Sequence, residues 1–88
     1  MIKIIIDYQV NSFEDLFFNC KCIESIYFKK CYRTNINNIN YMFFGCSSLK
    51  ELNLNNFNTN NVIYMYEMFS GCSNDLIMKI KSQYKNIK

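Results

Sequence analysis

Apolar and polar residues alternate in two different patterns along the chain. In "LKELNLNNF", residues 49–57, the leucines Leu52 and Leu54 alternate with polar residues, as on one face of a short strand. In "TNNVIYMYEMFSGC", residues 59–72, the apolar residues fall at helical or 3₁₀ spacing, and Thr59 or Asn60 can cap the start of a helix. This part of the sequence therefore predicts a strand, a loop, a short helix and a turn.

Both patterns recur along the chain at a fixed 26-residue spacing. The phrase "MFSGC" at Met68 repeats "MFFGC" at Met42, and the same step backward reaches "LFFNC" at Leu16. A fixed period between 20 and 50 residues is typical of solenoids, in which each turn buries its apolar face against the next. We therefore predict a single α/β solenoid with one short strand and one short helix per turn. Its predicted parts are a partial turn at 1–22, full turns at 23–48 and 49–74, and a C-terminal cap at 75–88.

The period also predicts a register and a set of structural positions. A constant step of 26 places Ile2 and Ile5 beneath Phe28 and Cys31 in neighbouring strands. Glycine adopts a positive φ at little cost, so Gly45 and Gly71 are expected to end the short helices. The repeat signature comprises Leu52, Leu54, Phe57, Met68, Phe69, Gly71 and Cys72, together with Met42, Phe43, Gly45 and Cys46 of the preceding turn.

The repeat resembles a known variety of leucine-rich repeat. Ile23, Ile26, Phe28 and Cys31 fit the general pattern L-x-x-L-x-L-x-x-N/C. "LKELNLNNFNTNNVIYMYEMFSGCS" is similar to the 26-residue repeat of the BspA-like surface-protein family. The resemblance implies a leucine-rich-repeat solenoid without enzymatic activity, associated with protein binding and adhesion, and located at the cell surface in longer members.

Composition argues against catalysis. The chain has no histidine, which removes the commonest general acid or base and the commonest metal ligand. Its carboxylates form no recurring pair, and "GCSSLK" lacks the second glycine and the ending of a phosphate-binding loop. We therefore expect no enzyme, no cofactor and no metal.

Five cysteines leave two readings open. Cys20, Cys46 and Cys72 share one column of the repeat, so stacked turns would bring them to about 5 Å, close enough for a disulfide. An odd number of cysteines favours free thiols that fill the core. A zinc site at Cys20, Cys22, Cys31 and Cys46 has no standard spacing.

The outward strand positions form the candidate partner-binding face. Steps of 26 residues along the chain align Lys3, Lys29 and Asn55. The same steps align Met1, Tyr27 and Asn53 beside them. The hypothesis is contact with a protein or an anionic glycan, centred on Tyr27 with Lys3 and Lys29. The alternative is an ordinary solvated strand face.

The C-terminal stretch departs from the repeat and carries the excess charge. The chain has a net charge of +3, but residues 76–88 hold four lysines and no acid, so a nucleic-acid surface over the whole domain is not expected. Leu76, Ile80, Tyr84 and Ile87 predict a capping helix, with Asn74 or Asp75 at its start. The alternative is a fourth strand that uses Met78 and Ile80. No signal peptide and no membrane span are predicted, and the N-terminal strand edge is expected to permit end-to-end stacking. The competing interpretation of the whole chain is a purely structural terminal segment of a longer repeat array, with no ligand of its own.

Overall fold

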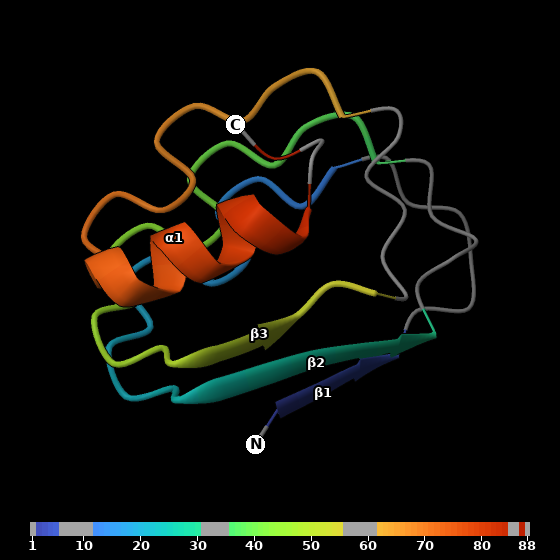
Figure 1. Cartoon of the computed structure of the whole chain (residues 1–88). Helices are drawn as coiled ribbons and strands as arrows, with labels where there is room; N and C mark the ends of the chain where they lie inside the picture. The colour runs from blue at the N-terminus through green and yellow to red at the C-terminus, as the bar shows by residue number, and fades with distance from the viewer. Residues whose placement is uncertain (1, 6–11, 31–35, 56–61, 85–86, 88) are drawn as a thin grey trace.

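Three parallel strands and one helix are the regular elements of a computed structural model, which describes residues 2–5, 12–30, 36–55, 62–84 and 87. The strands pair in the order β1-β2-β3, so each strand lies beside the next one in the chain (Figure 1). Their bounds are Ile2–Ile5 for β1, Ser25–Lys30 for β2 and Glu51–Asn53 for β3, and α1 spans Asn74–Gln83.

Opposite the sheet, three chain segments lie side by side as a second layer. We call residues 12–20, 36–46 and 62–72 the first, second and third ladder segments. Backbone N–H groups at alternate residues of the first segment donate to carbonyls of the second, as from Phe17 to Met42 at 2.9 Å. The second segment donates to the third in the same way, as from Phe43 to Met68 at 3.1 Å. Isolated parallel bridges join Ser12 to Asn38 and Asn38 to Tyr64, and both keep the 26-residue spacing.

The ladder segments stand where short helices were predicted, and that prediction is wrong for the described residues. Within a segment, intervening N–H groups bond three residues back, as from Phe44 to the Tyr41 carbonyl at 3.1 Å. A right-handed helix is interrupted because two positions of each segment have positive φ: Asp15, Tyr41 and Glu67 in one column, and Asn19, Gly45 and Gly71 in the other. The positive φ predicted for both glycines is confirmed, at 74° and 86°, but it occurs within tight turns.

The hydrophobic core lies between the sheet and the ladder. Alternate residues of β2 and β3 enter it, among them Ile26, Phe28 and Leu52. From the ladder side, Phe43 stacks between Phe17 and Phe69, with ring centroids 5.7 and 5.6 Å away. The 26-residue spacing thus brings equivalent side chains into contact from one segment to the next.

The predicted strand register is confirmed between β2 and β3 and wrong between β1 and β2. Tyr27 pairs with Asn53, which is the predicted 26-residue step. Between β1 and β2 the step is shorter by two, because Ile2 pairs with Ile26 and Lys3 with Tyr27. An irregularity follows between Ile4 and Ile5. Measured from the first strand pair, Ile2 and Ile26, to the bridge of Ser12 with Asn38, the first turn is therefore two residues shorter than the second. Measured from the last strand pair, Ile5 and Lys30, it is one residue shorter.

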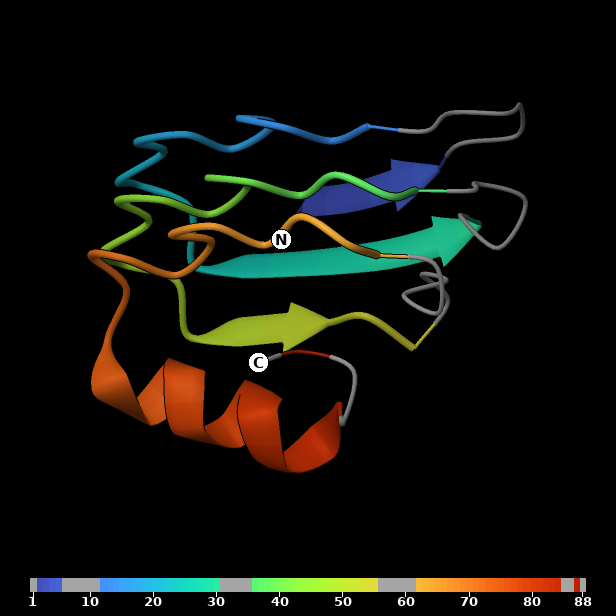
Figure 2. The same cartoon turned by 90° about the horizontal axis from the view of Figure 1, so that it is seen from above.

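The C-terminal helix predicted from residue 75 is present as α1, and the alternative of a fourth strand is wrong. Its N-cap is Ser73, whose hydroxyl accepts from the Leu76 N–H at 3.2 Å, so the predicted caps, Asn74 and Asp75, lie one and two residues too late. Leu76 and Ile80 are buried on its inner face. Figure 2 shows α1 beyond β3, at the opposite end of the stack from β1.

Within the described residues, the chain has no helix that is both long enough and apolar enough to cross a membrane.

Candidate binding cleft

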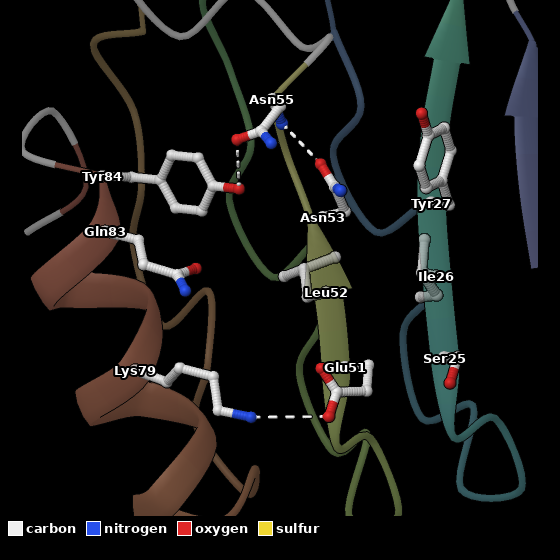
Figure 3. A pocket seen from close by; sticks show the side chains of 10 residues that line it. All are labelled: Ser25, Ile26, Tyr27, Glu51, Leu52, Asn53, Asn55, Lys79, Gln83 and Tyr84. Atoms are coloured by element: carbon white, nitrogen blue, oxygen red, sulfur yellow. Dashed lines mark hydrogen bonds and ion pairs between the residues drawn. The ribbon is translucent and has the colours of Figure 1, made fainter.

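A cleft of about 670 Å³ lies between the outer face of the sheet and α1 (Figure 3). Strands β2 and β3 form its floor and one wall, and the helix forms the other wall. Its lining residues are Ser25, Ile26, Tyr27, Glu51, Leu52, Asn53, Asn55, Lys79, Gln83 and Tyr84.

Strand alternation sets the polar side of the cleft. Leu52 and Leu54 point into the core, so Glu51 and Asn53 between and beside them face outward. Tyr27 is half-buried on β2 and lies next to Asn53 in the parallel ladder. The floor thus offers a phenol ring, an amide and a carboxylate in adjacent positions.

Tyr84 ties the helix to the end of β3. Its hydroxyl accepts from the Leu54 N–H at 2.9 Å and donates to the Asn55 side-chain oxygen at 2.9 Å. The Asn55 N–H in turn donates to the side-chain oxygen of Asn53 at 2.9 Å. The amide of Asn53 is therefore held in place before any ligand arrives.

An ion pair closes the other end of the cleft. Lys79 Nζ on α1 lies 3.6 Å from Glu51 Oε1 and also donates to the Lys50 carbonyl at 3.4 Å. Both side chains are largely exposed, so the pair contributes about 0–1 kcal/mol to stability. A ligand that competes for either group can therefore open it at small cost.

Three of the predicted face residues line this cleft, namely Tyr27, Asn53 and Asn55. Met1 lies outside the described residues. Lys29 is exposed on β2 but does not line it. Lys3 pairs with Tyr27 and not with Lys29 as predicted, because of the register shift, and its side chain lies outside the described part of the chain.

Sequence reasoning missed the helix wall. Lys79 and Gln83 are one helical turn apart and flank the buried stripe of Leu76 and Ile80, so they lie on one side of α1. The helical spacing of Lys79 and Gln83 could be read from the sequence. The sequence did not show on which side of β3 the helix packs.

The repeat signature is structural throughout the described residues. Its members Leu52, Leu54, Met68, Phe69, Met42, Phe43 and Cys46 are all buried in the core. Phe57 lies outside the described residues. Both signature glycines sit against the neighbouring segment: a Cβ on Gly71 would come within 3.1 Å of the Gly45 Cα.

The three cysteines of the shared column are free thiols, and two of them donate hydrogen bonds across the stack. Cys46 Sγ donates to the Phe17 carbonyl at 3.1 Å, and Cys72 Sγ to the Phe43 carbonyl at 3.2 Å. Burial raises the pKa of both thiols, and that of Cys72 reaches about 11. Neutral, bonded thiols of this kind are poor nucleophiles.

Metal-binding chemistry finds no support in the described part of the chain. No group of three or more Cys, Asp or Glu residues there could hold a metal ion. The predicted alternative at Cys20, Cys22, Cys31 and Cys46 includes Cys31, which lies outside the described residues.

Fold and cleft together define a small parallel-sheet protein whose turns stack at a 26-residue spacing and whose terminal helix borders a polar cleft. Residues 8–84 match the family described as "Mycoplasma protein of unknown function, DUF285", and the chain belongs to that family. No curated protein and no solved structure matches it.

Proposed function

We propose that this chain is a leucine-rich-repeat solenoid of the BspA-like kind, and that it acts as a non-enzymatic protein-binding or adhesion module. The cleft between the sheet and α1 carries the proposal, because it combines a volume of about 670 Å³ with polar groups held in place by hydrogen bonds. Three side chains expected from the sequence to meet a partner line it together. The 26-residue spacing of the stacked segments supports the solenoid.

The chemistry of the lining favours a protein segment as the ligand. Asn53 and Gln83 carry amides that both donate and accept, which suits the peptide groups of an extended chain. Tyr27 adds an aromatic surface of the kind enriched at interfaces. The charged groups of the lining are one lysine and one glutamate, so the cleft has no excess positive charge for an anionic glycan.

Selection from a displayed peptide library tests this proposal. The full chain is the target, and a Tyr27→Ala/Asn53→Ala variant is used for counter-selection. We expect peptides that bind the wild type and lose at least about tenfold in affinity on the double variant, as for a central interface aromatic. Lys29→Ala is the matched control, because Lys29 is exposed on the same strand but outside the cleft. Peptides that bind the wild type, the double variant and Lys29→Ala with equal affinity would contradict binding at the cleft.

A second function is favoured by the asymmetry of the two ends. In the described sheet, α1 packs beside β3, while β1 is an edge strand at the other end (Figure 2). That arrangement suits a structural terminal segment of a repeat array, which stacks on a preceding turn through β1.

Extension of the chain tests the second function. Fusing another copy of residues 23–48 before β1 is expected to raise the melting temperature if β1 is built to receive a turn. The matched control carries the same residues in scrambled order. An equal melting temperature for both fusions would argue against a stacking role.

A further inference from the structure

Four aromatic side chains form a partly exposed cluster on the ladder, away from the cleft. Phe18, Tyr41, Phe44 and Tyr66 come from all three ladder segments and contact one another through their rings. Phe18 and Phe44 stack with centroids 4.9 Å apart, and Tyr41 meets Tyr66 edge to face at 5.6 Å. We call these four residues the aromatic cluster.

The rings of this cluster are more exposed to solvent than the core rings of the same ladder segments. Phe17, Phe43 and Phe69 are buried, whereas Phe18 is 44% exposed and Tyr66 is 64% exposed. Large aromatic rings left in water lose the stabilisation that burial gives them, and contiguous exposed patches commonly mark interaction sites. The cluster is therefore a surface with unused apolar and π-electron contact area.

Acidic residues lie beside Tyr41, the central ring of the cluster, because Asp15 and Glu67 occupy the equivalent positions of the first and third ladder segments. Partial burial among its neighbours raises the pKa of the Tyr41 hydroxyl, and so do the charges of Tyr66, Glu67, Asp15 and Glu14. Those three carboxylates come from the first and third ladder segments, on either side of Tyr41 in the second. Rings whose faces are electron-rich and carboxylates at their rim attract the same kind of ligand, a cation.

The backbone beneath the cluster is fixed. The Tyr41 N–H donates to the Tyr66 carbonyl at 3.0 Å, and the Asn40 side chain accepts from the Tyr66 N–H at 2.6 Å. The Phe44 N–H donates to the Tyr41 carbonyl at 3.1 Å, and the Phe44 carbonyl accepts from Asn19. A ligand would meet rings on an ordered support, so little conformational entropy is lost on binding.

Tyr41 itself occupies a costly conformation. Its φ is 56°, in the left-handed region that asparagine or glycine adopts more cheaply than a bulky residue. A tyrosine at that position gives up some stability and gains a ring at the centre of the cluster, since it contacts all three other members.

We propose that the aromatic cluster and its rim of Glu14, Asp15 and Glu67 form a second docking surface, which binds an arginine-rich segment of a partner protein. Guanidinium groups stack on aromatic faces and bond carboxylates in pairs, so one arginine side chain can use both kinds of group. Charge complementarity selects this occupant: the rim is acidic, and a nucleic acid would be repelled from it.

Calorimetric titration of the full chain with a short peptide of alternating arginine and glycine tests the proposal. The reference peptide replaces arginine by citrulline, which keeps the shape and removes the charge. We expect binding of the arginine peptide alone, and weaker binding as salt rises. No difference between the two peptides would overturn the proposal.

Two variants separate docking from folding. Tyr41→Asn removes the central ring and suits the left-handed backbone, so it is expected to leave the melting temperature close to that of the wild type. Tyr66→Ala removes the most exposed ring of the cluster. Each variant is expected to bind the arginine peptide with roughly fivefold lower affinity than the wild type. Glu14→Gln with Glu67→Gln is expected to reduce both affinity and salt dependence.

Tyr64→Ala is the matched control, because Tyr64 is 54% exposed, two residues before Tyr66, and not a member of the cluster. It is expected to bind the peptide as the wild type does, and a loss equal to that of Tyr66→Ala would overturn the proposal. So would uptake of the chain by phosphatidylcholine vesicles that depends on Tyr66 and occurs without peptide binding. Failure of the cleft variants in the library selection leaves this result unaffected, since no residue is shared.

Discussion

The sheet and the ladder are built from the same three turns but keep the repeat with different strictness. In the ladder, the bridges of all three segments keep the 26-residue spacing. In the sheet, the spacing is 26 between β2 and β3 and falls to 24 over the first three pairs of β1 with β2, before the irregularity at Ile5 makes it 25. The same chain therefore tolerates a two-residue change in one layer and none in the other.

Backbone geometry explains the difference. A shift of two residues in a strand keeps every side chain on its original face, because side chains alternate with period two. In the ladder, left-handed residues, tight glycine contacts and stacked rings must all coincide, so a shift would break several of them together. The ladder is thus the part of the fold that fixes the repeat length.

Gly45→Ala is expected to have the largest effect, and it examines the ladder directly. A Cβ there would overlap the side-chain oxygen of Asn19 and come within 3.3 Å of the Asn19 Cα, while φ stays at +74°. We expect the free energy of unfolding to fall by about 2–4 kcal/mol, measured by urea denaturation. Adding Asn19→Gly should recover the part due to overlap with the side chain. An unchanged stability in the single variant would show that the ladder adapts as the sheet does.

Phe43→Leu is expected to have the second-largest effect on stability. Phe28→Leu is its counterpart in the sheet. Both phenylalanines are fully buried. Phe43 stacks between two rings at 5.7 and 5.6 Å, and Phe28 stacks on Phe13 at 6.1 Å. We expect losses of about 1–3 kcal/mol for Phe43 and less for Phe28, measured by thermal unfolding. A larger loss at Phe28 would reverse the ranking of the two layers.

Tyr84→Phe examines the point where the helix joins the sheet. The change removes a hydroxyl that bonds the Leu54 N–H and the Asn55 side chain, each at 2.9 Å. We expect a loss of about 1 kcal/mol in unfolding free energy and altered amide chemical shifts at residues 53–55. Ser82→Ala on the same helix is the control, since the Ser82 hydroxyl donates within α1, to the Lys79 carbonyl. Equal shifts in both variants would contradict the assigned role of Tyr84.

The smallest effect concerns alkaline pH. The pKa of Cys72 rises from 9.0 to about 11 in the folded state because the thiol is buried beside Cys46. Above about pH 9 the unfolded thiol loses its proton while the folded one keeps it, so stability decreases from there up to about pH 11. Urea denaturation across this range should show a weaker decline for Cys72→Ala than for wild type. The free energy of unfolding of Cys22→Ala, a change at an exposed cysteine, should decline over this pH range as that of the wild type does.

Sequence periodicity predicted the parts of the fold that depend on side-chain burial. The strands at Ser25–Lys30 and Glu51–Asn53, the C-terminal helix and the left-handed glycines were all expected. The ladder was mistaken for helices because apolar residues three and four apart suit either structure, and the alternate hydrogen bonds between segments leave no mark in the pattern.

The cleft could be predicted on its strand side only. Outward positions on β2 and β3 follow from the alternation that buries Ile26 and Leu52. Lys79 and Tyr84 could be assigned to a helix from the sequence, but not to a place beside β3, which depends on tertiary packing. The acidic rim of the aromatic cluster was hidden for the same reason, since Glu14 and Glu67 are distant in sequence.

The hydrogen bonds between the ladder segments also give the molecule a dipole. Peptide units joined through Phe17 N–H to the Met42 carbonyl, and through Phe43 N–H to the Met68 carbonyl, point the same way in series. Their dipoles add, so the third segment forms a positive pole and the first segment a negative one, as at the two ends of a helix. The stack thus draws cations toward the side that carries Glu14 and Phe18.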